Sequence, residues 1–396
     1  MAQRDHSRNQ ENPILKSAEV RTILFDMDGV ITSERKYWEA GGLTVAEILW
    51  SEDYVGLDSQ HFRIGAPLSQ LLDKAKRLLP DEIILALKSR AISTNWDITY
   101  MVASLHIIQL VRRAFPISEL LSDGLTDNTL RQLGYALKDK PYAIEDDTEL
   151  VRAFLDAKGN LRGYELIDSL NDWLQENTKL GAELFTRGDG FWKLCQDLFQ
   201  EWYLGDRLFE EVYGRMSSRK GKIGLIKSEA PLLPLEKLDT LFRMLRHAGY
   251  RLGIATGRPY EEIVTPLQDW GLLEYFDRGS IATHREVEQG EQSLAEAGIR
   301  KPLSKPDPFV FLRAIHPEVE DLALDRGDYS ADEHARVVVV GDTVSDIRAA
   351  KKAGFLTIAV LTGIGGERAR AVLIEERPDS VVKDVLCLSR VLGLEN

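Results

Sequence analysis

The chain of 396 residues contains only two cysteines, Cys195 and Cys387, far apart in the sequence. Neither belongs to a CxxC motif or a Cys/His cluster, so we predict neither a disulfide framework nor a structural zinc site. No uninterrupted apolar run reaches the roughly 18 residues of a membrane-spanning helix. The first 17 residues are polar and lack the apolar segment of a signal peptide. We therefore expect a cytoplasmic protein without a membrane partner and with a flexible N-terminus at residues 1–17.

Basic residues are in deficit, because 50 Lys and Arg face 63 Asp and Glu, which gives a net charge of -13. A nucleic-acid partner is therefore not expected, since phosphate backbones require a basic face. A small phosphorylated substrate is not excluded, because a few local charges govern such a site. The hydrophobic share of 44% and the charged share of 29% are typical of globular proteins.

What the sequence does contain is a pair of carboxylates directly after a short apolar run. Thr22–Phe25 is followed by Asp26, Asp28 and Gly29 in the stretch FDMDGV. Alternate residues of an extended chain share a face, so both acids are presented together at the end of a buried strand. Open α/β sheets bind their ligands at this edge.

A second apolar run, Arg251–Ala255, ends in Thr256 and Gly257. Taken alone, these two residues are better explained by a simple turn. Their place in a series of strand ends favours a role in binding.

A third apolar run, Arg336–Val340, is followed by GDTVSD, which contains Asp342 and Asp346. Carboxylates at a helix start also favour the helix dipole, an explanation that is stronger for Asp346 than for Asp342. Between the second and third runs, Lys305 lies in SKPDP, just before a predicted helix at Phe309–Ile315. Lys301 is also followed by proline, but Lys305 leads directly into the apolar segment.

This ordered set, DxDG, then Thr, then Lys, then GDxxxD, resembles the haloacid dehalogenase superfamily. The resemblance implies that Asp26 is a nucleophile that becomes an aspartyl-phosphate. It also implies a Mg²⁺ site formed by Asp26, the backbone carbonyl of Asp28 and the side chain of Asp342. Asp346 would support the water shell of the metal or orient Lys305.

Asp28 is implied to donate a proton to the leaving alkoxide and then to activate water. The haloacid dehalogenases and phosphonate hydrolases of the superfamily lack an acid here, so its presence points to phosphate esters. Thr256 and Gly257 would bind the phosphoryl group by hydrogen bonds. Lys305 would neutralise the nucleophile and the phosphoryl oxygens.

The spacing of the motifs predicts the domain organisation. Residues 18–32 and 226–396 would form the catalytic core, and residues 33–225 an insertion between the first and second motifs. At least five short apolar strands alternate with helices in the core, which predicts an α/β fold with a doubly wound parallel, Rossmann-like sheet. The insertion resembles the helical caps of phosphoglycolate phosphatases and β-phosphoglucomutase, but it is considerably larger than their four or five helices.

Within the insertion, Tyr164–Phe185 and Phe191–Tyr213 show helical periodicity. The basic cluster formed by Arg219, Lys220 and Lys222 is interpreted as a solvated charge run. In the core, residues 286–304 are polar and are expected to form a surface excursion. The extra cap helices have no assignment by resemblance.

The sequence therefore predicts a Mg²⁺-dependent phosphatase that hydrolyses a small phosphorylated metabolite through an aspartyl-phosphate. One alternative is a phosphomutase, in which a sugar hydroxyl replaces water as the acceptor. A non-enzymatic alternative is a silent module that binds a phosphorylated ligand or a partner protein. Retention of both Asp26 and Asp28 argues against the silent module, and the sequence does not indicate the oligomeric state.

Overall fold

The computed structural model describes residues 20–92, 94–114, 121, 124–138, 147–188 and 190–395. They form two compact units. The sheet unit comprises the described residues up to Glu34 and from Glu229 onward, and the helical unit comprises Arg35–Ser228. The segment expected to be a flexible N-terminus, residues 1–17, lies outside the described residues. Among the described residues, no helix is both long enough and apolar enough to cross a membrane.

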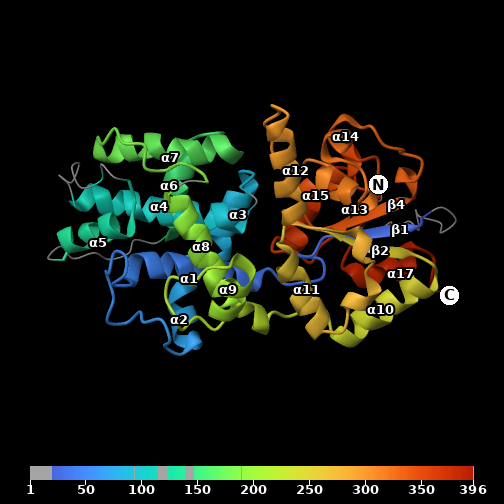
Figure 1. The fold of residues 1–396 in the computed structure, drawn as a ribbon, viewed down its shortest axis with the longest axis horizontal. Coiled ribbons are helices and arrows are strands. Elements are labelled where there is room, and N and C mark those ends of the chain that lie inside the picture. The colour runs from blue at the N-terminus through green and yellow to red at the C-terminus, as the bar shows by residue number, and fades with distance from the viewer. Residues whose placement is uncertain are drawn as a thin grey trace, which may run out of the picture. The chain divides into compact units, whose positions relative to one another are not determined.

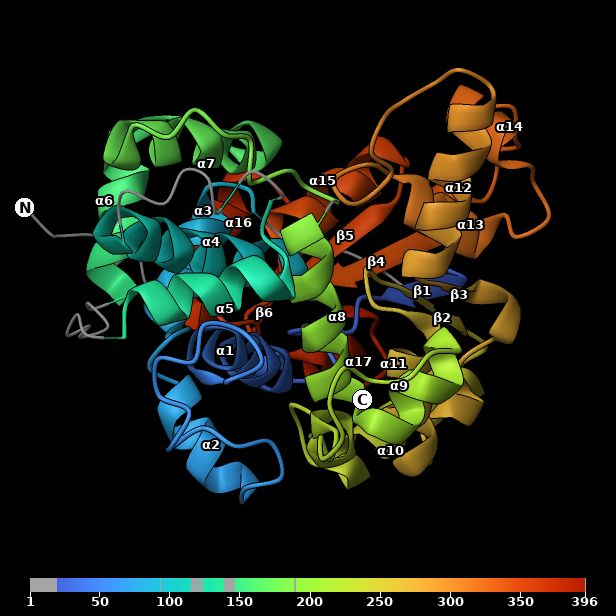
Figure 2. The same ribbon diagram turned by 60° about the vertical axis from the view of Figure 1, so that its left-hand side comes forward.

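The sheet unit is built on one six-stranded sheet in the order β3-β2-β1-β4-β5-β6, with every pairing parallel. The chain enters at the central β1 and extends the sheet in both directions, as Figure 2 shows. Thr22 of β1 aligns with Arg251 of β2 and Val337 of β4, so these three strands end level with one another. The predicted doubly wound α/β fold is confirmed. The strands are β1 Thr22–Phe25, β2 Arg251–Ala255, β3 Ile281–Ala282, β4 Val337–Gly341, β5 Leu356–Val360 and β6 Ser380–Val382.

Helices cover both faces of this sheet because its central strands are buried on both sides. Ile23 and Phe25 pack with α10, α11 and α17, whereas Leu24 packs with α12, α13 and α15 on the opposite face. Figure 1 shows these helices around the sheet. This alternation follows from the two-residue period of a strand. The helices are α10 Leu235–His247, α11 Tyr260–Asp269, α12 His284–Glu296, α13 Phe309–Ile315, α14 Asp321–Arg326, α15 Val344–Lys352, α16 Arg370–Glu375 and α17 Leu388–Val391.

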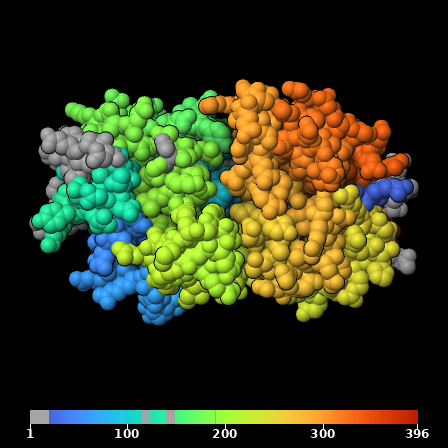
Figure 3. All heavy atoms as spheres, viewed as in Figure 1, coloured from blue at the N-terminus to red at the C-terminus, as the bar shows by residue number. Residues whose placement is uncertain are grey.

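The expectation of a surface excursion at residues 286–304 is wrong over most of its length. Helix α12 occupies His284–Glu296 and begins with a capping box formed by Thr283 and Glu286. Val287 and Leu294 are buried on its inner side, whereas most of its other side chains are polar and at least partly exposed. Figure 3 shows α12 at the surface of the sheet unit. The helix was not predicted because its apolar stripe is narrow and most of the residues around that stripe are polar.

The helical unit contains nine α-helices among its described residues, and α1, α4 and α8 contact one another at its centre (Figures 1 and 2). Helix α4 is buried along most of its length, as expected of a helix surrounded by others. The helices are α1 Arg35–Trp50, α2 Leu68–Ala75, α3 Asp81–Ser89, α4 Asn95–Ala114, α5 Asp127–Ala136, α6 Asp147–Ala157, α7 Gly163–Thr178, α8 Gly190–Leu204 and α9 Asp206–Tyr213.

Two sequence predictions in this unit need correction. The helical stretch Tyr164–Phe185 ends early, at Thr178 in α7. The stretch Phe191–Tyr213 is two helices, separated at Gly205 with φ of 78°. A side chain at Gly205 would collide with the backbone of Ile223, so the break also lets two segments approach closely.

Lys222 is not part of a solvated charge run, contrary to the sequence interpretation. Its side chain is 0% exposed and forms ion pairs with Glu47 at 3.0 Å and Glu201 at 2.5 Å. Its neighbours Arg219 and Lys220 are exposed and pair with surface acids. The basic cluster is thus divided between the interior and the surface of the helical unit.

Candidate active site

The side chains predicted to form a site follow strands that are neighbours in the sheet. Asp26 follows β1, Thr256 follows β2 and Asp342 follows β4. Since β1 lies between the other two strands in parallel register, its carboxyl end brings all three to one edge. The backbone N–H of Asp26 continues the ladder by donating to the carbonyl of Val340 at 3.0 Å.

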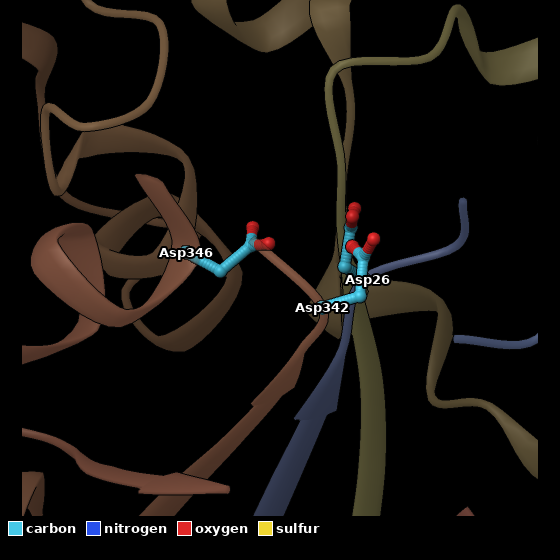
Figure 4. A group of neighbouring side chains, drawn as sticks. All are labelled: Asp26, Asp342 and Asp346. Atoms are coloured by element: carbon cyan, nitrogen blue, oxygen red, sulfur yellow. The ribbon is translucent and has the colours of Figure 1, made fainter. Parts of the chain in front are cut away.

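Three carboxylates converge at this edge, from Asp26, Asp342 and Asp346. One oxygen of each lies within 4.8 Å of the others, and all three residues are buried. In Figure 4 the carboxylates of Asp26 and Asp342 lie side by side, and that of Asp346 points toward them from α15. Such close like charges require cations or hydrogen-bond donors nearby.

Lys305 supplies one positive charge. Its Nζ donates to Asp26 Oδ1 at 3.0 Å and to the carbonyl of Ala255 at 2.9 Å, and it lies 2.8 Å from Asp346 Oδ1. Lys301, the alternative candidate, pairs instead with Asp325 and Asp307. The structure therefore brings Lys305, and not Lys301, to the acids.

The electrostatic balance of this cluster shows in two pKa shifts. Burial raises the pKa of Asp26 to about 6 against the opposing charge of Lys305, and the charges of Asp346 and Asp28 add to the rise. Burial alone would lower the pKa of Lys305, but the charges of Asp26 and Asp346 raise it above its usual value. Lys305 therefore stays protonated, and Asp26 becomes an anion near neutral pH.

Asp346 lies on α15, whereas Asp342 does not. Helix α15 begins at Val344, so Asp342 precedes it in the loop. Asp346 Oδ2 accepts hydrogen bonds from the backbone N–H of Thr343 at 3.1 Å and from its hydroxyl at 2.5 Å, completing a capping box. Its other oxygen faces Lys305, so Asp346 both caps the first turn of the helix and forms an ion pair with the lysine.

Two glycines enclose the carboxylate of Asp342. Gly29 has φ of +71°, and a Cβ at Gly29 or at Gly363 would overlap the side chain of Asp342. The hydroxyl of Thr362 donates to the carbonyl of Gly29 at 2.5 Å and joins the two loops. Sequence reasoning missed Gly363, because no acidic residue marks the end of β5.

Thr256 and Gly257 differ in their surroundings. Thr256 is buried, and its hydroxyl oxygen accepts a hydrogen bond from the backbone N–H of Arg258 at 3.3 Å. Gly257 is exposed, and a Cβ there would meet open space. In the loop after β2, the Thr256 hydroxyl stabilises a turn and the peptide of Gly257 is exposed. This geometry is compatible both with a simple turn and with a binding role.

Asp28 is held by an arginine that sequence reasoning passed over. Arg258 donates from Nε to both carboxylate oxygens of Asp28, at 3.1 and 3.0 Å, and from Nη2 to Oδ1. Nη2 also donates to Glu229 Oε1 at 2.6 Å. Arg258 was visible in TGRP, but its partners lie 230 and 29 residues away, so no local signal pointed to them.

The donor set fits a hard divalent cation. Within the described part of the chain, Asp26, Asp342 and Asp346 are the residues placed close enough together to hold a metal ion. All three offer oxygen atoms, and one lysine does not balance three carboxylates. Oxygen ligands from one or two carboxylates suit Mg²⁺, which keeps several of its waters.

The fold and these side chains define an α/β protein with an acid-rich site at the carboxyl edge of its sheet. The chain belongs to the haloacid dehalogenase-like hydrolases, because the sequence profile of that family matches residues 20–354. The superfamily suggested by the motifs is thus confirmed.

A crystal structure solved as a structural genomics target is 32% identical to the chain, with a TM-score of 0.78. The similarity covers 94% of this chain and 98% of that one. The comparison with curated proteins found no match.

Other matching structures are more distant in both sequence and structure. A provisionally named phosphatase from Clostridium difficile is 16% identical, with a TM-score of 0.39, over 94% of this chain and 99% of that one. The provisionally named hydrolase YfnB from Bacillus subtilis, bound to magnesium, is 14% identical, with a TM-score of 0.38, over 95% and 99%. Structures provisionally named β-phosphoglucomutases are equally remote, at 15% and 13% identity.

Proposed function

We propose that the protein is a Mg²⁺-dependent phosphatase that hydrolyses a small phosphorylated metabolite through an aspartyl-phosphate. The observation that carries this proposal is the convergence of Asp26, Asp342 and Asp346 around Lys305 at the carboxyl edge of the sheet. A phosphate monoester is an anion, and a carboxylate can approach it only where positive charge is concentrated. When bound, Mg²⁺ supplies such charge and polarises the phosphoryl oxygens.

In the first step, an oxygen of Asp26 attacks phosphorus, and the ester P–O bond breaks. The leaving alkoxide takes a proton from the carboxyl of Asp28. Lys305 donates to Asp26 and lies close enough to offset the charge that develops on the phosphoryl group. The hydroxyl of Thr256 and the exposed peptide of Gly257 serve as further donors from the loop after β2.

In the second step, water attacks the phosphorus of the aspartyl-phosphate. Asp28, now a carboxylate, takes the proton from that water, and the bond to Asp26 breaks to release inorganic phosphate. One carboxyl thus serves first as acid and then as base, which returns the site to its starting state.

The helical unit is assigned the role of a cap that selects the substrate. It interrupts the sheet unit between the residues of the first and second motifs, which is where substrate-selecting caps are inserted in the families the sequence resembles. Its size, Arg35–Ser228, sets it apart from their compact caps, so it does not transfer their substrates to this chain.

The test is release of inorganic phosphate from a panel of phosphate esters, with Mg²⁺ and with EDTA. We expect Mg²⁺-dependent turnover of at least one small ester, and mass spectrometry of quenched enzyme to show a phosphoryl group on Asp26. Transfer to a sugar hydroxyl instead of water would identify a phosphomutase. Absence of phosphorylation on Asp26, with no turnover of any ester, would favour a silent binding module.

A further inference from the structure

The hydrogen bonds of Asp28 extend the proposed function to two residues without an assigned role, Arg258 and Glu229. The Arg258 side chain is 2% exposed and that of Glu229 is 0% exposed, whereas that of Asp28 is 24% exposed. The carboxylate that must meet the substrate is therefore the accessible member of a buried triad. Arg258 Nη1 also donates to the carbonyl of Glu262 at 3.3 Å, so its guanidinium is fixed from several directions.

The position of Glu229 suggests what it contributes. Arg258 Nη2 donates to Glu229 as well as to Asp28, so one nitrogen joins the two carboxylates. The Arg258–Glu229 pair is enclosed, whereas Asp28 is partly exposed. Glu229 thus fixes the guanidinium from the buried side, and the guanidinium presents its remaining donors to Asp28.

We propose that Arg258 is a positioning residue for Asp28, and that Glu229 holds Arg258 in the orientation that this requires. This inference rests on the proposed function, because it concerns the orientation of the carboxyl that acts on the leaving group. The planar fork of arginine fixes both oxygens of a carboxylate at once, which lysine does not do. Arg258 acts through Asp28, the carboxylate to which it donates.

Two esters of similar size distinguish loss of this positioning role from a general loss of activity. Phenyl phosphate has a poor leaving group and needs the proton from Asp28, whereas 4-nitrophenyl phosphate leaves without it. The kcat/KM value reports the steps up to departure of the leaving group. In Arg258→Gln we expect the ratio of kcat/KM, 4-nitrophenyl over phenyl, to rise at least about tenfold, since general acid catalysis contributes about 10²–10⁴-fold.

A double-mutant cycle tests whether Arg258 acts through Asp28. Asp28→Asn should raise the same ratio, and adding Arg258→Gln should change it by less than about twofold, because the group being positioned is already lost. Arg258→Lys should fall between wild type and Arg258→Gln. Arg251→Gln is the control, since Arg251 starts β2, the strand that precedes Arg258, and pairs with Asp277, and its ratio should equal that of wild type.

Arg258→Gln leaves Glu229 buried opposite a neutral group, which is expected to destabilise the fold. A second variant is therefore needed to separate loss of stability from loss of positioning. The charge-matched variant Arg258→Gln with Glu229→Gln removes both buried charges and should show the same rise in the ratio. A contact readout that needs no turnover is the Nε–H NMR signal of Arg258, identified by its loss in Arg258→Lys. Asp28→Asn should shift this signal and speed its exchange with water, whereas Asp277→Asn should not.

The outcomes separate the two proposals. No turnover of either ester by the wild type would overturn the proposed function and with it the role of Arg258. Turnover with an unchanged ratio in both the single and the charge-matched variant would overturn the inference alone. Multiplying effects of Arg258→Gln and Asp28→Asn would also overturn it, because they would show that Arg258 acts on the substrate directly.

Discussion

Each unit of the molecule contains a buried lysine between two carboxylates. In the sheet unit Lys305 lies between Asp26 and Asp346, and in the helical unit Lys222 lies between Glu47 and Glu201. The ion-pair distances are similar, from 2.8 to 3.0 Å in the first cluster and from 2.5 to 3.0 Å in the second. Pair geometry alone does not reveal which cluster is a site for chemistry.

The cluster around Lys222 is closed. The indole N–H of Trp202 donates to Glu47 at 2.7 Å, and the backbone N–H and hydroxyl of Ser218 donate to Glu201 at 2.7 and 2.6 Å. Together with the lysine, these donors reach all four carboxylate oxygens. Side-chain exposure of the three charged residues is 1% or less. A satisfied and enclosed network of this kind fixes the packing of helices.

The cluster around Lys305 is open by the same criteria. Lys305 is 12% and Asp26 is 11% exposed, and a third carboxylate, from Asp342, joins the two that the lysine contacts. Three acids and one lysine sum to -2, compared with -1 for the two acids and lysine of the closed cluster. Excess negative charge and access to solvent, and not burial of a lysine, distinguish the candidate metal site.

Asp26→Asn should produce the largest effect and should change activity and stability in opposite directions. Loss of the nucleophile is expected to reduce turnover by about 10⁴-fold or more, because covalent catalysis ends. Stability without metal should rise at pH 7.5. The raised pKa means that the stabilising contribution of Asp26 is complete below its ordinary value of 3.8 and is lost as pH increases through about 6. Urea unfolding in EDTA is the measurement, and lower stability of the variant would contradict it.

Lys222→Met should come next, with a loss of about 3–5 kcal/mol in the free energy of unfolding. The substitution leaves two buried carboxylates without their shared cation. Chemical denaturation measures the loss, and Lys220→Met is the matched control because Lys220 is exposed and pairs with surface Glu210. Equal effects of the two substitutions would show that the closed network does not stabilise the helical unit.

Asp342→Asn is expected to raise the Mg²⁺ concentration for half-maximal activity by about 10–100-fold, a range typical of weakened metal sites. The asparagine keeps the size of the side chain, which the close approach of Gly29 and Gly363 requires. Calorimetry of Mg²⁺ binding should show the same shift. An unaltered Mg²⁺ requirement would place the metal away from the three carboxylates.

Glu47→Gln should have the smallest effect, within about 1 kcal/mol at acidic pH. Burial raises the pKa of Glu47 against the opposing charge of Lys222, and the charge of Glu201 adds to the rise. Its contribution to wild-type stability is therefore complete below the ordinary value of 4.5 and is lost as pH increases through the raised value. The variant should gain relative to wild type across that window in urea unfolding. A constant difference from pH 4 to 8 would refute this.

The sequence was sufficient to predict those features of the molecule that follow from where the strands end. Because parallel strands place their carboxyl ends together, it predicted the doubly wound sheet and the convergence of Asp26 and Asp342. The roles of these residues remain predictions. Lys305 was preferred to Lys301 as the site lysine because an apolar helix directly follows Lys305. That distinction depends on local sequence alone.

What the sequence did not disclose depends on partners that are distant along the chain. Nothing near Arg258 indicates that it contacts Asp28 and Glu229, and nothing near Lys222 indicates a place inside the helical unit. A run of basic residues is typically solvated, so the buried member had no signature. Helix α12 was missed for a related reason, since its inward stripe is narrow.

Two short segments of the sheet unit bear on how such a large insertion is tolerated. The backbone N–H of Ser33 donates to the carbonyl of Ala230 at 3.3 Å, and that of Leu232 donates to the carbonyl of Ile31 at 2.9 Å. The chain therefore leaves the sheet unit and returns to it at adjacent points, which these two backbone hydrogen bonds join. Loop-closure entropy grows only logarithmically, by about 0.6 kcal/mol for each doubling of length. A longer inserted segment is thus nearly neutral for folding of the sheet, and the inserted segment can change in length as if it were a separate module.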